Sequence, residues 1–186
     1  MSDGVTPDDV LKHEQPTKSY LCKLTDNEYG VEFLEFKVLD YDTQRNFFHV
    51  NKPADEPPMD YAAIPPEHED AYRTINYQFP TDFLKCKTMR TALVFRVGTQ
   101  EVNNFRMIER HYFKNKLIRS YDFEFGFCIP NSTNSWEAIY PIPERSAEEI
   151  AEFKNSPDGH RSDSFYFVGD KLIMHNKAMY NYADDA

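Results

Sequence analysis

The sequence predicts an all-β protein, an antiparallel β-sandwich, and two observations support this fold class. Fifteen Phe, twelve Tyr and one Trp occur among 186 residues, although the mean hydropathy is low, at −0.70. Disordered chains are poor in aromatic residues, so this combination fits strands whose side chains alternate between core and solvent. The second observation is that strand-like segments follow one another without alternating helices, which favours a sandwich over a parallel sheet.

The N-terminal segment, residues 1–28, is predicted to be mobile and to lie outside the sandwich, because no apolar periodicity connects it to the strands. Residues 6–9 (Thr-Pro-Asp-Asp) offer an N-cap, a proline at the first helical position and acidic residues near the positive end of a helix dipole. One short helix over about residues 7–13 is therefore expected. The β-sandwich domain is assigned to residues 29–186.

The first strand pair is predicted from a change of period. From Tyr29 onward apolar residues recur at every second position, and the parity changes at Leu34. Such a change predicts a bulge, or a strand buried on both faces. Residues 45–50 can return beside this strand as a hairpin across residues 40–43. Five prolines among acidic residues between positions 51 and 70 then predict a long exposed loop.

The rest of the chain is expected to hold six further strands, a second loop and one short helix. Period-two alternation predicts the strands over about residues 72–79, 91–97, 105–113, 117–129, 163–168 and 172–181. The segment that precedes Pro141 and Pro143 is expected to be a loop. Ser146 and Glu149 have the spacing of a capping box, which predicts a helix over about residues 147–154. The total is eight or nine strands.

Charge and cysteine usage indicate a cytoplasmic protein. Lys and Arg number 21 against 31 Asp and Glu, and the net charge of −10 is unfavourable for binding nucleic acid or an anionic membrane. No apolar run approaches the roughly 20 residues that span a bilayer, and residues 1–4 begin a polar acidic segment unlike a signal peptide. Three widely spaced cysteines, Cys22, Cys86 and Cys128, favour reduced thiols.

No motif for enzyme or cofactor chemistry stands out. The six glycines are scattered, whereas phosphate-binding loops need clustered glycines. None of the six histidines has another at the spacing that is typical of zinc sites. We therefore expect no catalytic residues, no metal and no cofactor. A metal site formed across strands, or a β-sandwich hydrolase, is the alternative that remains from the enzyme class.

Aromatic residues concentrate in one predicted strand. Four rings share a face of the segment 120–128: Tyr121, Phe123, Phe125 and Phe127. Such a face either fills a core, as in a plain interaction domain, or lines a cavity. In the preceding strand Glu109 and His111 share a face with aromatic residues. A buried carboxylate needs a partner, and an acceptor beside a donor in an apolar slot suits a tunnel that orients the amide of an acyl chain.

Six runs of residues resemble the uncoordinated-119 lipid-binding chaperones of the GMP-phosphodiesterase delta-subunit family. They are residues 20–22, 33–40, 103–113, 123–130, 162–168 and 174–178. The resemblance covers about residues 6–182, and runs of this length are highly specific.

The resemblance implies an immunoglobulin-like sandwich with a hydrophobic cavity between its sheets. It implies a carrier, not an enzyme, that binds the myristoyl group of N-terminally acylated proteins, extracts them from membranes and traffics them, often to cilia or flagella. It also implies release of the cargo by a GTP-bound Arf-like GTPase. By motif position, the lipid-binding residues are expected to be Phe33, Phe36, Tyr77, Glu109, His111, Phe123 and Tyr166.

One segment departs from this pattern. Residues 129–136 look more like the corresponding loop of the prenyl-binding delta subunit, which also shares the Phe-Glu-Phe-Gly-Phe run at 123–127. That subunit lacks the Met-Ile-Glu-Arg-His run at 107–111 and the Met-His-Asn-Lys-Ala run at 174–178. A prenyl-binding carrier of the delta-subunit type is therefore the alternative function.

Overall fold

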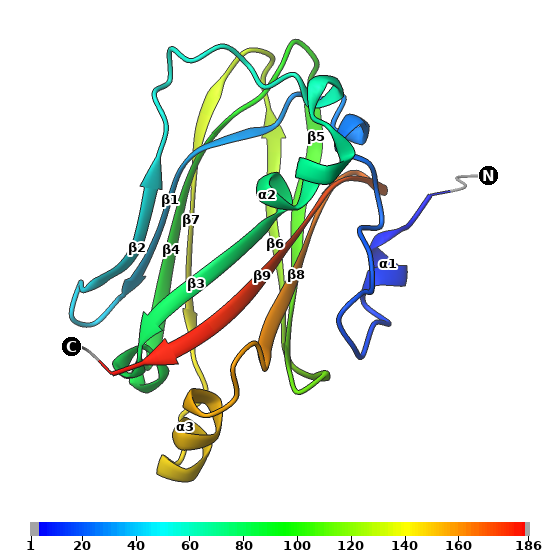
Figure 1. Cartoon of the computed structure of the whole chain (residues 1–186). Coiled ribbons are helices and arrows are strands. Elements are labelled where there is room, and N and C mark those ends of the chain that lie inside the picture. Colours follow the sequence, from blue (N-terminus) through cyan, green and yellow to red (C-terminus); the bar gives the residue numbers. More distant parts are fainter. Residues whose placement is uncertain (1–3, 185–186) are drawn as a thin grey trace.

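The computed structural model describes residues 4–184 and shows two β-sheets packed face to face (Figure 1). Nine strands form them: β1 Glu32–Asp40, β2 Asn46–Asn51, β3 Thr74–Pro80, β4 Thr88–Arg96, β5 Val102–Phe113, β6 Lys116–Cys128, β7 Thr133–Pro141, β8 His160–Val168 and β9 Lys171–Ala183. The short helices are α1 Pro7–Val10, α2 Glu69–Arg73 and α3 Ala147–Lys154. The predicted all-β sandwich is thus confirmed. No helix within residues 4–184 is long and apolar enough to cross a membrane.

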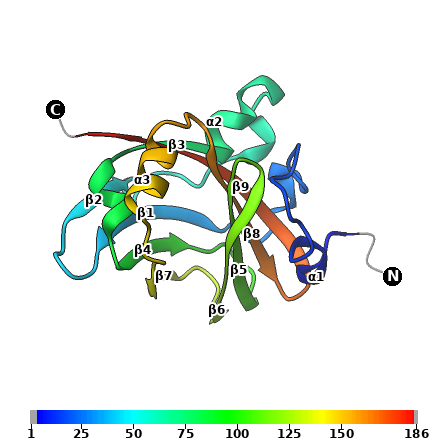
Figure 2. The ribbon, with the colours of Figure 1, turned by 90° about the horizontal axis from the view of Figure 1, so that it is seen from below.

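One sheet has the strand order β2-β1-β4-β7 and the other has the order β3-β9-β8-β5-β6. The two sheets come close at β6 and β7 (Figure 2). Every pairing is antiparallel except that of β3 with β9, which is parallel and sets Thr74 opposite Lys177. The expectation of a purely antiparallel sandwich was wrong at this edge. Residues 52–73 lead the chain from β2 to the other sheet. There β3 forms the edge strand and runs parallel to β9.

Strand β7 occupies the segment that was expected to be a loop before Pro141 and Pro143. It pairs with β4, with Trp136 opposite Leu93, and its residues alternate between half-buried and exposed positions. Pro141 is the last residue of this edge strand, where a missing N–H group breaks no ladder hydrogen bond. The loop prediction was wrong because the prolines mark the end of a strand.

Several local predictions are confirmed. The register of β1 shifts between Phe33 and Glu35, as the change of parity indicated. The hairpin of β1 and β2 forms as expected. At the start of α3 the Ser146 hydroxyl accepts a hydrogen bond from the Glu149 amide at 3.2 Å, and the Glu149 carboxylate accepts one from the Ser146 amide at 2.8 Å. This reciprocal capping box begins the one short helix of the late loop.

The aromatic face of β6 ends earlier than the alternation suggested. Gly126 has φ +98°, a conformation that side chains rarely adopt, and the register shifts around Phe105 on the neighbouring strand. The resulting bulge turns Phe127 to solvent, where it is 51% exposed. Phe127 therefore does not belong to the inward-facing series of rings.

The N-terminal segment packs on the five-stranded sheet, on the face that points away from the other sheet (Figures 1 and 2). Val10 is fully buried in a cluster with Ile108, Phe165, Phe167 and Leu172. The absence of an apolar periodicity in residues 1–28 did not mean that the segment lacks apolar contacts with the sandwich. Val10 packs there together with the partly buried Val5, Leu11, Leu21 and Cys22, whose irregular spacing creates no periodic pattern. The boundary at residue 28 and the mobility of the segment stay predictions, and residues 1–3 lie outside the described part of the chain.

A buried carboxylate fastens the same segment. Asp163 accepts hydrogen bonds from the Thr17 amide at 2.9 Å, from His175 Nε2 at 2.9 Å and from Lys177 Nζ at 2.7 Å. His175 Nδ1 in turn accepts a hydrogen bond from the Leu21 amide at 3.0 Å. Burial opposes the charge of Asp163, but these donors hold the pKa of its carboxyl below the ordinary value.

Candidate functional site

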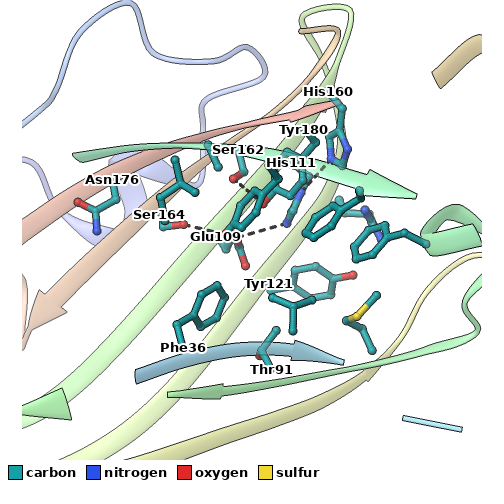
Figure 3. Close-up of a pocket in the computed structure, with 18 of the residues that line it drawn as sticks. Phe36, Thr91, Glu109, His111, Tyr121, His160, Ser162, Ser164, Asn176 and Tyr180 are labelled. Carbon is teal, nitrogen blue, oxygen red and sulfur yellow. Dashed lines mark hydrogen bonds and ion pairs between the residues drawn. The ribbon is translucent and has the colours of Figure 1, made fainter. Parts of the chain in front are cut away.

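A cavity of about 220 Å³ lies between the two sheets (Figure 3). Aromatic rings form much of its wall: Phe33, Phe36, Tyr77, Phe79, Phe83, Tyr121, Tyr140, Tyr166, Tyr180 and Tyr182. Two of its lining residues are exposed, Val50 by 48% and Ile75 by 39%. They lie on β2 and β3, which are edge strands of the two sheets. The cavity therefore reaches solvent beside these edges.

Strands β5 and β8 place polar side chains inside this apolar space. Glu109 and His111 share the inward face of β5, as the alternation predicted, and Ser162 and Ser164 come from β8. Figure 3 shows the Glu109 carboxylate between His111 and Ser164. Its Oε1 atom lies 3.4 Å from His111 Nε2 and 3.5 Å from Ser164 Oγ.

The polar groups continue as a chain toward the C-terminal strand. His111 Nδ1 lies 3.1 Å from His160 Nε2, and His160 Nδ1 lies 2.6 Å from the Tyr182 hydroxyl. One assignment of protons satisfies every contact. Tyr182 donates to His160 Nδ1, His160 Nε2–H donates to His111 Nδ1, and His111 Nε2–H points to Glu109. Each histidine is then neutral.

Burial explains the protonation states in this chain. Burial lowers the pKa of His111, and it lowers that of His160 well below the ordinary value, with a further contribution from the repulsion between the two rings if both were protonated. Burial alone would raise the pKa of Glu109, but His111, Arg119 and Ser164 lower it. The cavity thus holds a carboxylate whose free lone pairs can accept hydrogen bonds from a ligand.

Six of the seven residues that the resemblance singled out line the cavity: Phe33, Phe36, Tyr77, Glu109, His111 and Tyr166. They come from both sheets, and Tyr166 packs against Phe33 with ring centroids 5.2 Å apart. Phe123 is not among the lining residues. Its ring stacks on Tyr121 at 5.7 Å and lies 5.8 Å from Tyr140, so it supports two rings that do line the cavity. The role of all seven residues in lipid binding stays a prediction.

Several lining residues were missed from the sequence: Arg119, Tyr140, Arg145, His160, Ser162 and Tyr180. Arg119 could have been found, because it shares the parity of Tyr121 and Phe123 on β6. Arg145 lies between β7 and α3, where no periodicity applies. His160 belongs to β8, which begins three residues earlier than the predicted strand.

The described residues that line the cavity include no cysteine. Within residues 4–184 no three His, Cys, Asp or Glu side chains come together in a way that could hold a metal ion. The three cysteines are free thiols. Burial raises the pKa of Cys86 to about 12 and that of Cys128 to about 11, so neither thiol is an activated nucleophile at neutral pH.

Comparison with known proteins gives consistent matches along the chain. A family model described as GMP-PDE, delta subunit, matches residues 25–182. Protein unc-119 of Caenorhabditis briggsae is 43% identical over 178 residues, which cover 96% of this chain and 80% of that protein. Protein unc-119 homolog B of Danio rerio is 47% identical over 182 residues, covering 96% and 74% respectively. The human protein unc-119 homolog B is 43% identical, covering 97% and 72%.

Proposed function

The chain belongs to the GMP-PDE delta-subunit family, and on this premise we propose that it is a lipid-binding carrier, not an enzyme. Its ligand would be the myristoyl group of N-terminally acylated proteins, which it would extract from membranes and transport. The single observation that supports this proposal best is the ring-lined cavity with one half-buried carboxylate, Glu109, on its wall. An apolar space with few polar groups suits a long chain that carries one polar linkage.

Burial of the chain supplies enough free energy for extraction. A myristoyl group has about 13 carbons beyond its carbonyl, and each buried methylene contributes about 0.8 kcal/mol, so the chain contributes on the order of 10 kcal/mol. Ordering the chain and the peptide offsets part of this. One myristoyl group anchors a protein only marginally to a bilayer. A protein cavity that encloses the chain can therefore compete with the membrane.

The cavity is small for such a chain. Its volume of about 220 Å³ lies below the roughly 300–1,000 Å³ of sites for drug-sized ligands. We therefore expect lining rings such as Phe36 to move apart when the acyl chain enters. Val50 and Ile75 mark the edges between which it would pass.

Glu109 favours an acyl ligand over a prenyl ligand. An N-terminal acyl group is attached through an amide, whose N–H can donate to the Glu109 carboxylate. A prenyl group is attached through a thioether, which has no donor. The loop that resembles the delta subunit, residues 129–136, contributes no lining residue to the cavity. A prenyl-binding carrier is therefore the second candidate, and it rests on that loop and on the shared Phe-Glu-Phe-Gly-Phe run at 123–127.

Two further parts of the proposal rest on the family resemblance. We propose that an Arf-like small GTPase in its GTP form binds the carrier and releases the acylated cargo. We also propose that the carrier acts in the cytoplasm and, in ciliated or flagellated cells, delivers cargo to that organelle. Addition of a GTP-loaded Arf-like GTPase should speed the dissociation of a fluorescent acyl peptide, whereas the GDP-loaded form should leave the rate unchanged.

Fluorescence polarisation tests the lipid class. The wild-type protein should bind an N-myristoylated peptide at least tenfold more tightly than a C-terminally farnesylated peptide of the same length. Glu109→Leu should lower the affinity for the myristoylated peptide by about tenfold or more, since hydrogen bonds to charged groups contribute roughly 1.5–3 kcal/mol. It should change the affinity for the farnesylated peptide by less than threefold. Glu137→Gln, at an exposed position on β7, is the matched control. Equal or reversed affinities would favour the prenyl-binding alternative.

A further inference from the structure

Two arginines on the cavity wall form no close ion pair within the described part of the chain. Arg119 lies on β6, Arg145 lies between β7 and α3, and both line the cavity. Nε and Nη1 of Arg119 are buried and form no hydrogen bond with any residue of the described chain. The Arg145 guanidinium lies over the Phe153 ring, 4.7 Å from its centroid, and the Glu149 carboxylate is the one that acts on its pKa.

The lining residues carry more positive than negative charge. Glu109 is the one carboxylate among the described lining residues. Lys177 also lines the cavity, but Asp163 neutralises it at 2.7 Å. The two lining histidines are neutral because burial lowers their pKa values. Arg119 and Arg145 therefore face one carboxylate on the wall, Glu109, and one behind it, Glu149, which acts on Arg145 without forming an ion pair with it.

The two guanidinium groups also disfavour each other. Burial lowers the pKa of Arg145, and the charge of Arg119 lowers it further. The Tyr121 hydroxyl, two residues from Arg119 on the same face of β6, is buried; burial raises its pKa, and the neighbouring Arg119 lowers it. These groups together present unpaired donors and positive charge without a close ion pair to one region of the cavity. An anion bound there would correct both deficits at once.

We propose that Arg119 and Arg145 bind a carboxylate of the ligand that occupies this cavity, with the Tyr121 hydroxyl as an additional donor. A planar guanidinium matches a carboxylate through two parallel hydrogen bonds. The carboxylate belongs either to a free long-chain fatty acid or to an acidic side chain in the first residues of an N-acylated peptide. The proposal rests on the proposed function, since an acyl chain must fill the apolar part of the same cavity.

Competition against a fluorescent, uncharged N-myristoylated peptide tests the proposal at pH 7. The first pair of competitors is laurate and 1-dodecanol, which share a chain length and differ in the carboxylate. The second pair is an N-myristoylated peptide with Glu at its third residue and the same peptide with Gln there. The proteins are the wild type, Arg119→Gln, Arg145→Gln and the control Arg161→Gln, at an exposed position on β8.

The measured quantity is the affinity ratio within each pair, because a general loss of binding cancels from a ratio. We expect the wild type and Arg161→Gln to favour the carboxylate by at least tenfold in one pair. Arg119→Gln and Arg145→Gln should each bring that ratio to within threefold of unity. A preference for laurate alone would identify the fatty acid as the source, and a preference for the Glu peptide alone would identify the cargo side chain.

Two outcomes would overturn the proposal: ratios near unity in both pairs for the wild type, or a carboxylate preference that both cavity variants retain. These results leave the proposed function intact as long as the uncharged myristoylated peptide still binds. Failure of that peptide to bind, together with an arginine-dependent preference for laurate over 1-dodecanol in direct calorimetric titrations, would instead refute the carrier of acylated proteins and support the anion site. Thermal melting of each variant confirms that it is folded.

Discussion

Acid should destabilise this protein in large part through one buried histidine, His160. Its side chain is 2% exposed and lies between the Tyr182 hydroxyl and His111. Burial, together with the repulsion between the two rings if both were protonated, holds its folded-state pKa well below the ordinary value of about 6.5. The unfolded chain takes up a proton near pH 6.5, whereas the folded chain does not. The stability is therefore complete above pH 6.5 and falls as the pH decreases below it.

The size of the effect follows from linkage. One proton that only the unfolded state binds removes about 1.4 kcal/mol of unfolding free energy for each pH unit. Between pH 6.5 and pH 5 His160 should therefore account for a loss of about 2 kcal/mol. His111 and His175, whose pKa values are also lowered by burial, add to the wild-type slope but remain in a His160 variant.

Urea unfolding at half-unit steps of pH measures this contribution. His160→Asn should lower the stability at pH 7, and its unfolding free energy should then decline less steeply by about 1.4 kcal/mol per pH unit below 6.5. His68→Asn, at an exposed position, controls for the loss of one histidine. Equal slopes for His160→Asn and the wild type would refute the assignment of a neutral His160. So would an NMR titration that shows its imidazolium in the folded protein at pH 6.

Three substitutions extend the test to other parts of the fold. Val10→Asp buries a carboxylate on the outer face of the five-stranded sheet, so limited proteolysis should cleave the N-terminal segment faster than in the wild type. The affinity for an acyl peptide should stay within threefold, because the cavity lies on the opposite face of the sheet, and a larger loss would contradict this separation. Phe123→Asp removes ring contacts with Tyr121 and Tyr140, so it should lower the unfolding free energy by roughly 1–3 kcal/mol and leave the protein folded. If circular dichroism melting finds no folded state, this strand is packed core. Gly98→Ala would place a Cβ atom 2.9 Å from the Tyr29 carbonyl oxygen, and this overpacking should lower the unfolding free energy measured with urea by about 1–3 kcal/mol. A variant as stable as the wild type would show that the loop adapts.

Local periodicity predicted those parts of the site that lie on regular strands. Glu109 and His111 face the cavity because side chains alternate along β5. The same rule failed at Phe127, since Gly126 inserts a bulge that changes the parity. It also does not apply to Arg145, which lies outside the strands.

Pairings between distant segments could not be predicted from the sequence. Alternation identifies β3 and β9 as strands, but their parallel pairing depends on the path of the chain between the sheets. The chain of polar groups has the same origin, because its members come from different strands. His160 contacts His111, and Tyr182 contacts His160, only in the folded sheet. A resemblance to known proteins can identify such residues, whereas the physical pattern of one strand cannot.

The parallel edge has a consequence for the order in which the protein folds. β9 lies between β3 and β8, and the pairing of Thr74 with Lys177 closes a loop of about a hundred residues, which is slow. During synthesis β3 leaves the ribosome long before β9, its one partner in the sheet. Until then its edge, with the exposed Ile75, is open to pairing with other chains. The proline-rich segment that precedes β3 cannot extend this edge, which limits aggregation of the nascent chain.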